Sequence, residues 1–363
     1  MFTVMAVLLL AAVSAPAQRK IQVALLLDTS NSMDGLIDQA KSQLWSIVNE
    51  MASARAEGRA PEIEIALYEY GNDGLKAEAN YIRRVLPLSH DLDKISEALF
   101  ALKTNGGNEY CGAVIAQSMK DLAWSASNRD LKLIYIAGNE PFNQGGIDYK
   151  AACRAAISKG IVVNTIFCGD HEEGISSFWK DGADLSEGKY FNIDHNRATV
   201  YIETPYDKQI NELNGRLNDT YIGYGALGVE KKENQVLQDR NAESYSSSNA
   251  AERAASKSTA AYRADDWDLV DAYKNGNVDV KSIKPAELPA ELKGKTPAEI
   301  KAYVDKKAAE RAAIQQQIRE LDKKRGDYMA VELKKRGEDH SLNAAMAKSM
   351  RERAQKTGFT FEK

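Results

Sequence analysis

The junction between the apolar segment 21–27 and the polar run Asp28-Thr29-Ser30-Asn31-Ser32 constrains the fold more than any other part of this sequence. A strand buried on both faces of a sheet is a nearly continuous apolar run. The polar run therefore predicts the turn at which that strand gives way to a helix. It places one carboxylate and two hydroxyls at the carboxyl end of the strand, where open α/β sheets bind ligands. Such hard oxygen donors suit Mg²⁺ or Mn²⁺.

Apolar segments continue to alternate with stretches of helical periodicity as far as residue 217. Strands are predicted over 62–70, 81–88, 131–137, 161–167 and 190–193. Helices are predicted over 36–51, 92–102, 113–126, 149–159, 175–179 and 206–217. Strands alternating with helices are typical of an α/β fold. We therefore expect a doubly wound, mostly parallel sheet within residues 18–228.

The first 17 residues have the pattern of a secretory signal peptide. An apolar stretch over 4–13 precedes Ala15-Pro16-Ala17, a small-residue cleavage site before Gln18. The stretch is too short to span a bilayer, which takes about 20 residues. We expect an exported protein, periplasmic or secreted, without a membrane span.

Residues 229–363 differ in composition from the α/β segment, being rich in Ala, Lys, Glu, Arg and Gln. Thr296-Pro297-Ala298-Glu299 predicts a helix start, and the helix continues to about residue 336. Its apolar positions approach a heptad seam that is interrupted by Lys307, Arg311 and Arg325. The pattern favours a charged helical region that packs on the domain or on a partner over an autonomous coiled coil.

Asp28, Ser30 and Ser32 after a buried strand, in an exported α/β domain, resemble the von Willebrand factor type A domain over roughly residues 20–225. The resemblance implies a metal-ion-dependent adhesion site, in which all three residues serve the metal directly or through water. An acidic residue of a partner protein would complete the coordination. The alternative is that Ser30 and Ser32 only cap the following helix.

Two further loops of this family contribute to the metal site, and here both depart from the family pattern. Asn108 stands where the second loop usually has Thr, and Glu109 offers a neighbouring carboxylate. Gly138 stands where the third loop usually has Asp, with Asn139 and Glu140 as the nearest oxygen donors. An amide in place of an anionic ligand weakens a hard-cation site without abolishing it. We expect a weakly bound Mg²⁺, or Mn²⁺ or Ca²⁺, held by Asp28, Ser30 and Ser32 with Asn108 or Glu109 and with Asn139 or Glu140.

The three cysteines lie near the same edge of the sheet in this architecture. An exported chain with three cysteines is expected to form one disulfide and leave one thiol. We predict the pair Cys153–Cys168, with Cys111 as a possible competitor. The alternative is that each cysteine is a small buried apolar residue.

Several other functional classes find little support. Residues 223–228 match G-x-G-x-x-G by letters, but no strand precedes them as a dinucleotide site requires; a flexible exit from the domain is expected. A haloacid dehalogenase-type phosphatase would need an acid where Ser30 stands. The sequence contains no basic stripe with interleaved aromatic residues, so a nucleic-acid partner is not expected. The histidines show no metal-ligand spacing: His90, His171, His195 and His340.

The sequence thus predicts a non-enzymatic protein-binding module that engages a protein ligand through a divalent cation. Two alternatives remain open. One is a scaffold that binds partners without metal through the same loops or the helical region. The other is a metal-dependent hydrolase in which Asp28 or Ser32 reacts.

Overall fold

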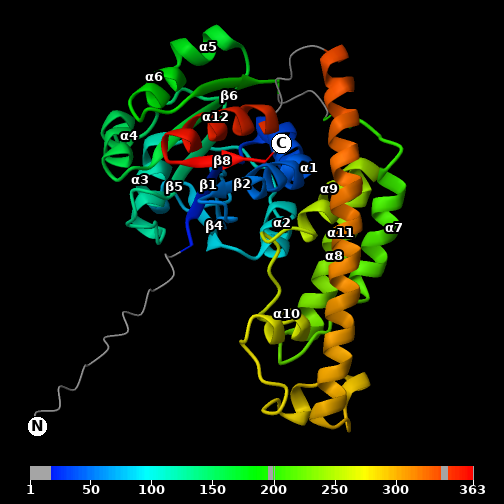
Figure 1. Ribbon diagram of the computed structural model, residues 1–363. Coiled ribbons are helices and arrows are strands. Elements are labelled where there is room, and N and C mark those ends of the chain that lie inside the picture. The colour runs from blue at the N-terminus through cyan, green and yellow to red at the C-terminus, as the bar shows by residue number, and fades with distance from the viewer. Residues whose placement is uncertain (1–17, 195–198, 200, 337–341, 363) are drawn as a thin grey trace, which may run out of the picture.

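The computed structural model describes residues 18–194, 199, 201–336 and 342–362. The predicted signal peptide, His195 and His340 lie outside these residues. Figure 1 shows a central sheet covered by helices on both faces, with a column of helices along one side.

The described residues form a six-stranded sheet whose order is β4-β3-β1-β5-β6-β7. All neighbouring strands are parallel except β3 and β4. This confirms the predicted doubly wound, mostly parallel sheet. The strands are β1 (Lys20–Asp28), β3 (Glu62–Tyr70), β4 (Ile82–Ser89), β5 (Leu131–Gly138), β6 (Val162–Cys168) and β7 (Tyr190–Ile193).

Strand β1 lies at the point where the strand order reverses. The chain leaves β1 for β3 on one side and later returns to β5 on the other. Asp28 is therefore flanked by the carboxyl ends of both neighbours, in register with Tyr70 of β3. Ligands bind at such a switch point in open α/β sheets.

Two layers of helices bury the sheet, because successive strand residues point to opposite faces. Val23, Leu25 and Leu27 of β1 belong to one core, and Ala24 and Leu26 belong to the other. The first face is covered by α1 (Asp34–Ala52), α2 (Leu92–Phe100), α7 (Asp207–Asn218) and α12 (Leu342–Lys356), and the second by α3 (Cys111–Asp121), α4 (Tyr149–Ser158) and α6 (Trp179–Asp184).

Some helix bounds differ from the prediction. The helix expected over 113–126 ends at Asp121. The helix expected over 175–179 is instead two short helices, α5 (His171–Ser176) and α6, separated by Phe178 in the left-handed conformation at φ 72°. An aromatic residue rarely adopts that conformation, so no local pattern predicted the break.

The helical column, residues 207–336, is formed by α7 with α8 (Gly228–Tyr245), α9 (Ser247–Lys257), α10 (Leu269–Lys274) and α11 (Pro297–Arg336). Helix α11 has 40 residues and runs along the whole column (Figure 1). Its start is the predicted capping box: the backbone N–H and hydroxyl of Thr296 both donate to Glu299 Oε2, at 2.8 and 2.7 Å. Short 3₁₀ turns complete the described fold: η1 (Asn31–Met33), η2 (Ala77–Ala79), η3 (Pro285–Glu287) and η4 (Ala290–Leu292).

The arginines that interrupt the apolar seam of α11 are buried anchors. Arg311 bonds Asp268 and Asp271, each at 2.6 Å. Arg325 bonds Asp207 of α7 at 2.9 Å and Glu252 of α9 at 3.1 Å. The helix therefore packs on its own chain, as an appendage rather than as one strand of a coiled coil.

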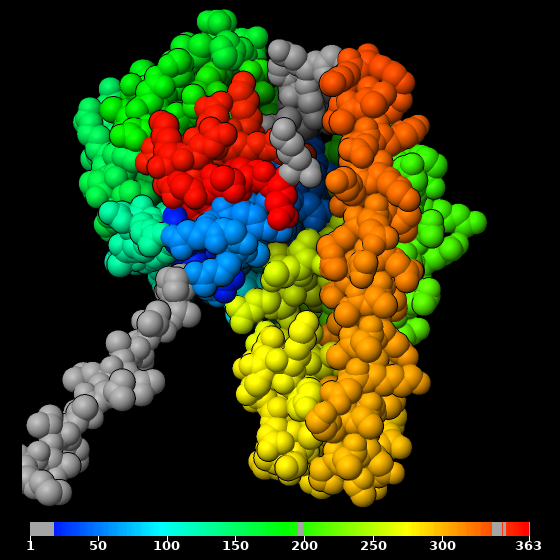
Figure 2. Space-filling model, in the orientation of Figure 1, coloured from blue at the N-terminus to red at the C-terminus, as the bar shows by residue number. Residues whose placement is uncertain are grey.

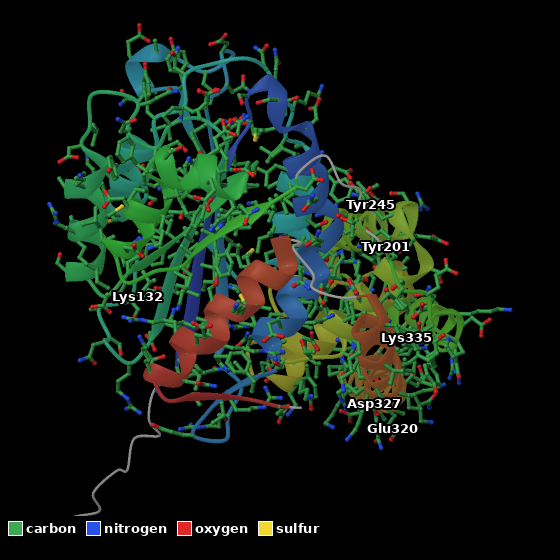
Figure 3. The ribbon with its side chains drawn as sticks, turned by 90° about the horizontal axis from the view of Figure 1, so that it is seen from above. Lys132, Tyr201, Tyr245, Glu320, Asp327 and Lys335 are labelled. Carbon is green, nitrogen blue, oxygen red and sulfur yellow. The ribbon has the colours of Figure 1, made fainter. Side chains whose placement is uncertain are left out.

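The column is joined closely to the sheet domain. Tyr245 donates to Asp38 of α1 at 3.0 Å, and Tyr201 donates to the carbonyl of Ser42 at 3.3 Å. Both tyrosines are labelled in Figure 3, where they lie on the side of α1 that faces the column. Asn249 of α9 donates to Tyr201 at 3.2 Å. Tyr201 therefore connects α9 of the column to α1 of the sheet domain.

The C-terminal segment also belongs to the domain core. Helix α12 lies across the sheet domain in Figure 2 and buries Met346 and Met350. Ser349 shares a 2.8 Å hydrogen bond with Tyr135 of β5. Strand β8 (Phe359–Phe361) then pairs with β2 (Ala54–Ala56). The C-terminal part of residues 229–363 therefore packs into the core of the α/β segment.

The G-x-G-x-x-G segment is a bonded turn rather than a flexible exit. Gly223 forms a bridge with Asp268, and the N–H of Tyr224 donates to the carbonyl of Trp267 at 2.9 Å. The segment leads directly into α8 at Gly228. It follows α7 rather than a strand, so it lacks the context of a dinucleotide site.

Every helix among the described residues is either too short or too polar to span a lipid bilayer.

Candidate functional site

The first loop turns immediately after β1. Asp28 is fully buried, and its Oδ1 accepts a 2.8 Å hydrogen bond from the N–H of Ser30. Its Oδ2 is buried without a hydrogen-bond partner among the described residues. A buried carboxylate oxygen in that state is costly unless a donor or cation reaches it.

The two serines of this loop face each other rather than capping a helix. Their hydroxyl oxygens lie 3.4 Å apart. Ser30 is the N-cap residue of η1 but makes no side-chain cap, and the N-cap of α1 is Met33. The alternative in which the serines only cap the helix is therefore wrong, and two hydroxyls remain beside the Asp28 carboxylate.

The second loop brings Glu109, and not Asn108, toward the first. Asn108 is exposed, whereas Glu109 is only 5% exposed. The loop lies over the first one, because the N–H of Asn105 donates to the carbonyl of Thr29 at 2.9 Å. Of the two candidates in this loop, Glu109 is the one placed beside Asp28.

The third loop contributes Asn139 and Glu140. The Asn139 amide donates to Ser32 Oγ at 3.1 Å, and its Oδ1 is buried without a hydrogen-bond partner among the described residues. Glu140 is held by its carbonyl, which accepts a 2.8 Å hydrogen bond from the indole of Trp179. Both predicted donors thus lie at the edge of the site.

Gly138 shows why the third loop has no Asp at the family position. A Cβ there would lie 2.6 Å from the Tyr70 hydroxyl and 3.0 Å from Asp28 Oδ2. The hydroxyl is fixed by a 3.0 Å hydrogen bond to the carbonyl of Ala137. Tyr70 therefore fills the space that a side chain at residue 138 would need.

Burial and neighbouring carboxylates raise the pKa values of Asp28 and Glu109. Burial raises the pKa of Asp28 to about 7 and the Glu140 carboxylate adds to the rise, although the hydrogen bonds from Ser30 oppose it. Burial also raises the pKa of Glu109 to about 8, and the charges of Asp28 and Glu140 contribute. A cation placed among these acids would relieve both effects.

The donor set fits a hard divalent cation. Carboxylates, hydroxyls and an amide carbonyl are all oxygen ligands, which Mg²⁺, Mn²⁺ and Ca²⁺ accept. In the part of the chain that the structure describes, no three His, Cys, Asp or Glu side chains form a group that could hold a metal by themselves. The serine hydroxyls are therefore needed as ligands.

The predicted Cys153–Cys168 disulfide is not formed. All three cysteines are free and buried. Cys153 of α4 packs in the core on one face of the sheet, and Cys168 at the end of β6 packs in the core on the other. The sheet itself separates the two sulfurs. The alternative, small buried apolar residues, describes all three, since Cys111 packs in the same core as Cys153.

Tyr70 and Gly71 belong to this site but were not identified from the sequence. Tyr70 is the last residue of β3, the parallel neighbour of β1, and the register partner of Asp28, and Gly71 follows it directly. The signal that could have found them is this position, because strands adjacent to β1 bring their carboxyl ends to the same edge.

Residues 22–199 match the family profile of the von Willebrand factor type A domain. The chain therefore contains such a domain, as the first loop suggested. A search of curated proteins gives no match.

Solved structures that match part of this chain include BatB from Bacteroides thetaiotaomicron, which is 17% identical with a TM-score of 0.37 over 48% of this chain and 90% of that one. The SpRpn10 VWA domain is 16% identical with a TM-score of 0.37, covering 48% and 87%. An aerotolerance-related membrane protein from Bacteroides fragilis is 17% identical with a TM-score of 0.34, covering 48% and 92%.

Proposed function

We propose that this von Willebrand factor type A domain is an exported, non-enzymatic module that binds a protein partner through a divalent cation at the carboxyl edge of its sheet. Domains of this type are generally interaction modules. The observation that carries the proposal is the fully buried Asp28, whose Oδ2 has no hydrogen-bond partner among the described residues and whose loop also carries the paired hydroxyls of Ser30 and Ser32.

In this proposal Asp28, Ser30 and Ser32 hold the cation, with Asn139 or Glu140 at the rim. The cation would supply a positive charge that an acidic side chain of the partner can ligate. Asp28 contributes charge, and its bond to the N–H of Ser30 keeps the loop turned. Asn139 orients Ser32 through its amide. Export to the periplasm or the medium rests on the signal-like residues 1–17, and N-terminal sequencing of the mature protein should begin at Gln18.

Metal binding is tested first on the purified mature chain by calorimetric titration with Mn²⁺ and Mg²⁺. Wild type is expected to bind one cation, and Asp28→Asn to bind at least about tenfold more weakly because it removes a ligand charge. Glu172→Gln, which removes an exposed acid in α5, should bind like wild type. Absence of binding by wild type at millimolar cation would refute the metal site.

A metal-independent scaffold is the second candidate, favoured by the loss of the third-loop acid at Gly138. Partner capture from an envelope extract separates the two functions. The cation mechanism requires capture by wild type in Mg²⁺ and its loss both in chelator and in Asp28→Asn. Capture that is indifferent to chelator and to the variant supports the scaffold. A hydrolase would instead be detected by turnover of generic phosphate or ester substrates.

A further inference from the structure

The path of the second loop is fixed by close backbone contacts, and it decides which side chain enters the site. A Cβ at Gly107 would lie 2.1 Å from the carbonyl oxygen of Gly71, so only glycine permits this approach. The carbonyl of Gly106 also accepts a hydrogen bond from the N–H of Asp73. With residues 106 and 107 held in this way, Asn108 points to solvent and Glu109 is buried.

Glu109 and Asp28 meet across a second glycine. A Cβ at Gly71 would lie 2.7 Å from Glu109 Cγ and 2.9 Å from Asp28 Oδ1. Gly71 has φ +78°, a conformation that side-chain-bearing residues rarely adopt. The two acidic side chains therefore occupy the space on either side of this glycine, next to the Ser30 hydroxyl, which interacts with Glu109.

No basic side chain neutralises this pair in the way that buried acids usually require. The described ion pairs of the protein do not include Asp28 or Glu109, and Asp28 Oδ2 is buried without a hydrogen-bond partner among the described residues. Two adjacent buried carboxylates repel each other unless a proton or a cation lies between them. The arrangement is thus incomplete within the chain itself.

We propose that Glu109 is a cation ligand that supplies, from the second loop, the carboxylate that the third loop lacks at Gly138. This inference rests on the proposed cation site and adds a residue outside the usual family pattern. The loss of one acid and the gain of another have linked causes: Tyr70 and Asp28 occupy the space at residue 138, and the paired glycines 71 and 107 open the path for residue 109. Because this carboxylate comes from the chain itself, the cation binds before any partner does.

The test is a Mn²⁺ titration of the mature chain by calorimetry and by electron paramagnetic resonance of free Mn²⁺, with four proteins compared. Glu109→Gln keeps the shape of the side chain but removes its charge, and its affinity should fall by at least about tenfold. Asn108→Ala is the matched control from the same loop and should bind within about twofold of wild type. Asp28→Asn, which should also bind Mn²⁺ more weakly, tests whether the cation lies at the first loop.

A second measurement separates a ligand from a residue that only supports the fold. In wild type, saturating Mn²⁺ should raise the melting temperature, because a ligand that binds only the native state stabilises it. Glu109→Gln should retain a cooperative transition in chelator and lose most of the Mn²⁺-induced rise.

Each outcome decides between the two proposals. If wild type and Asn108→Ala bind Mn²⁺ and Glu109→Gln does not, both the site and the role of Glu109 stand. If Glu109→Gln binds like wild type while Asp28→Asn does not, the site survives and the inference is wrong. If Asn108→Ala loses Mn²⁺ binding and Glu109→Gln keeps it, the second-loop ligand is Asn108. If wild type does not bind, both proposals fall together.

Discussion

Two regions of this protein bury charged side chains, and they do so in opposite ways. Where the helical column meets α2, Asp93 of α2 forms an ion network with Asp239, Arg253 and Lys257 of the column. Each acid faces a cation: Arg253 bonds Asp93 at 2.8 Å and Asp239 at 2.5 Å, and Lys257 bonds Asp239 at 3.2 Å. At the sheet edge, the site acids Asp28 and Glu109 lie next to each other around Gly71, and none of the described ion pairs includes either of them.

The pKa values follow this difference. Burial alone would raise the pKa of Asp239, but the charges of Lys257 and Arg253 outweigh it and hold the pKa well below its usual value. Burial and the charges of neighbouring carboxylates instead raise the pKa values of Asp28 and Glu109. Charge that is balanced within the chain serves the fold, whereas unbalanced charge at a switch point indicates a site for an external cation.

The largest expected effect comes from breaking the network of the column. Arg253→Met should lower the free energy of unfolding by about 3–5 kcal/mol, because it leaves Asp93 and Asp239 buried with too little positive charge. Urea denaturation measures it. Lys180→Met, which breaks an exposed pair with Asp184, should change stability by less than about 1 kcal/mol. Equal losses in the two variants would contradict a structural role for the network.

A smaller effect should appear in the pH dependence of the same network. Burial lowers the pKa of Lys257 from 10.5 to about 8, although Asp239 opposes the shift. Between these values the unfolded chain binds the proton and the folded chain does not, so stability rises with pH across this window. Wild type should gain about 1–3 kcal/mol relative to Lys257→Met between pH 8 and pH 10.5. If the free energies of unfolding of the two proteins change with pH in parallel, Lys257 does not cause the rise in stability.

The smallest expected effect has the opposite sign and lies at the sheet edge. In chelator at pH 8.5, Glu109→Gln should raise the free energy of unfolding by about 1–2 kcal/mol, because it removes repulsion between site acids. With Mn²⁺ added, wild type should instead have the higher free energy of unfolding, because it binds the cation more tightly than the variant does. Asn108→Ala is the control, with little change in either buffer. A loss of stability for Glu109→Gln in chelator would place Glu109 among the structural charges.

The sequence was informative where local patterns decide the structure. The apolar run before Asp28 predicted the central strand, and Thr296 with Glu299 predicted the start of α11. It was uninformative where distant segments meet. Whether Asn108 or Glu109 enters the site depends on the contact between Gly107 and Gly71, and no local pattern encodes that contact.

Two other features depend on contacts between distant segments in the same way. Arg311 and Arg325 look like interruptions of an apolar seam when their partners Asp268 and Asp207 are unknown. The cysteine pairing failed because Cys153 and Cys168 lie near the same edge of the sheet but on opposite faces. Proximity along an edge does not determine the face.

The most direct test of the cation site is a crystal structure of the mature chain grown with Mn²⁺, with anomalous differences measured near the manganese edge. We expect a single strong peak in contact with the first loop, ligated by Asp28, Ser30, Ser32 and Glu109, and no peak there in crystals of Asp28→Asn. An anomalous map without a peak beside Asp28, at Mn²⁺ concentrations of several millimolar, would contradict it.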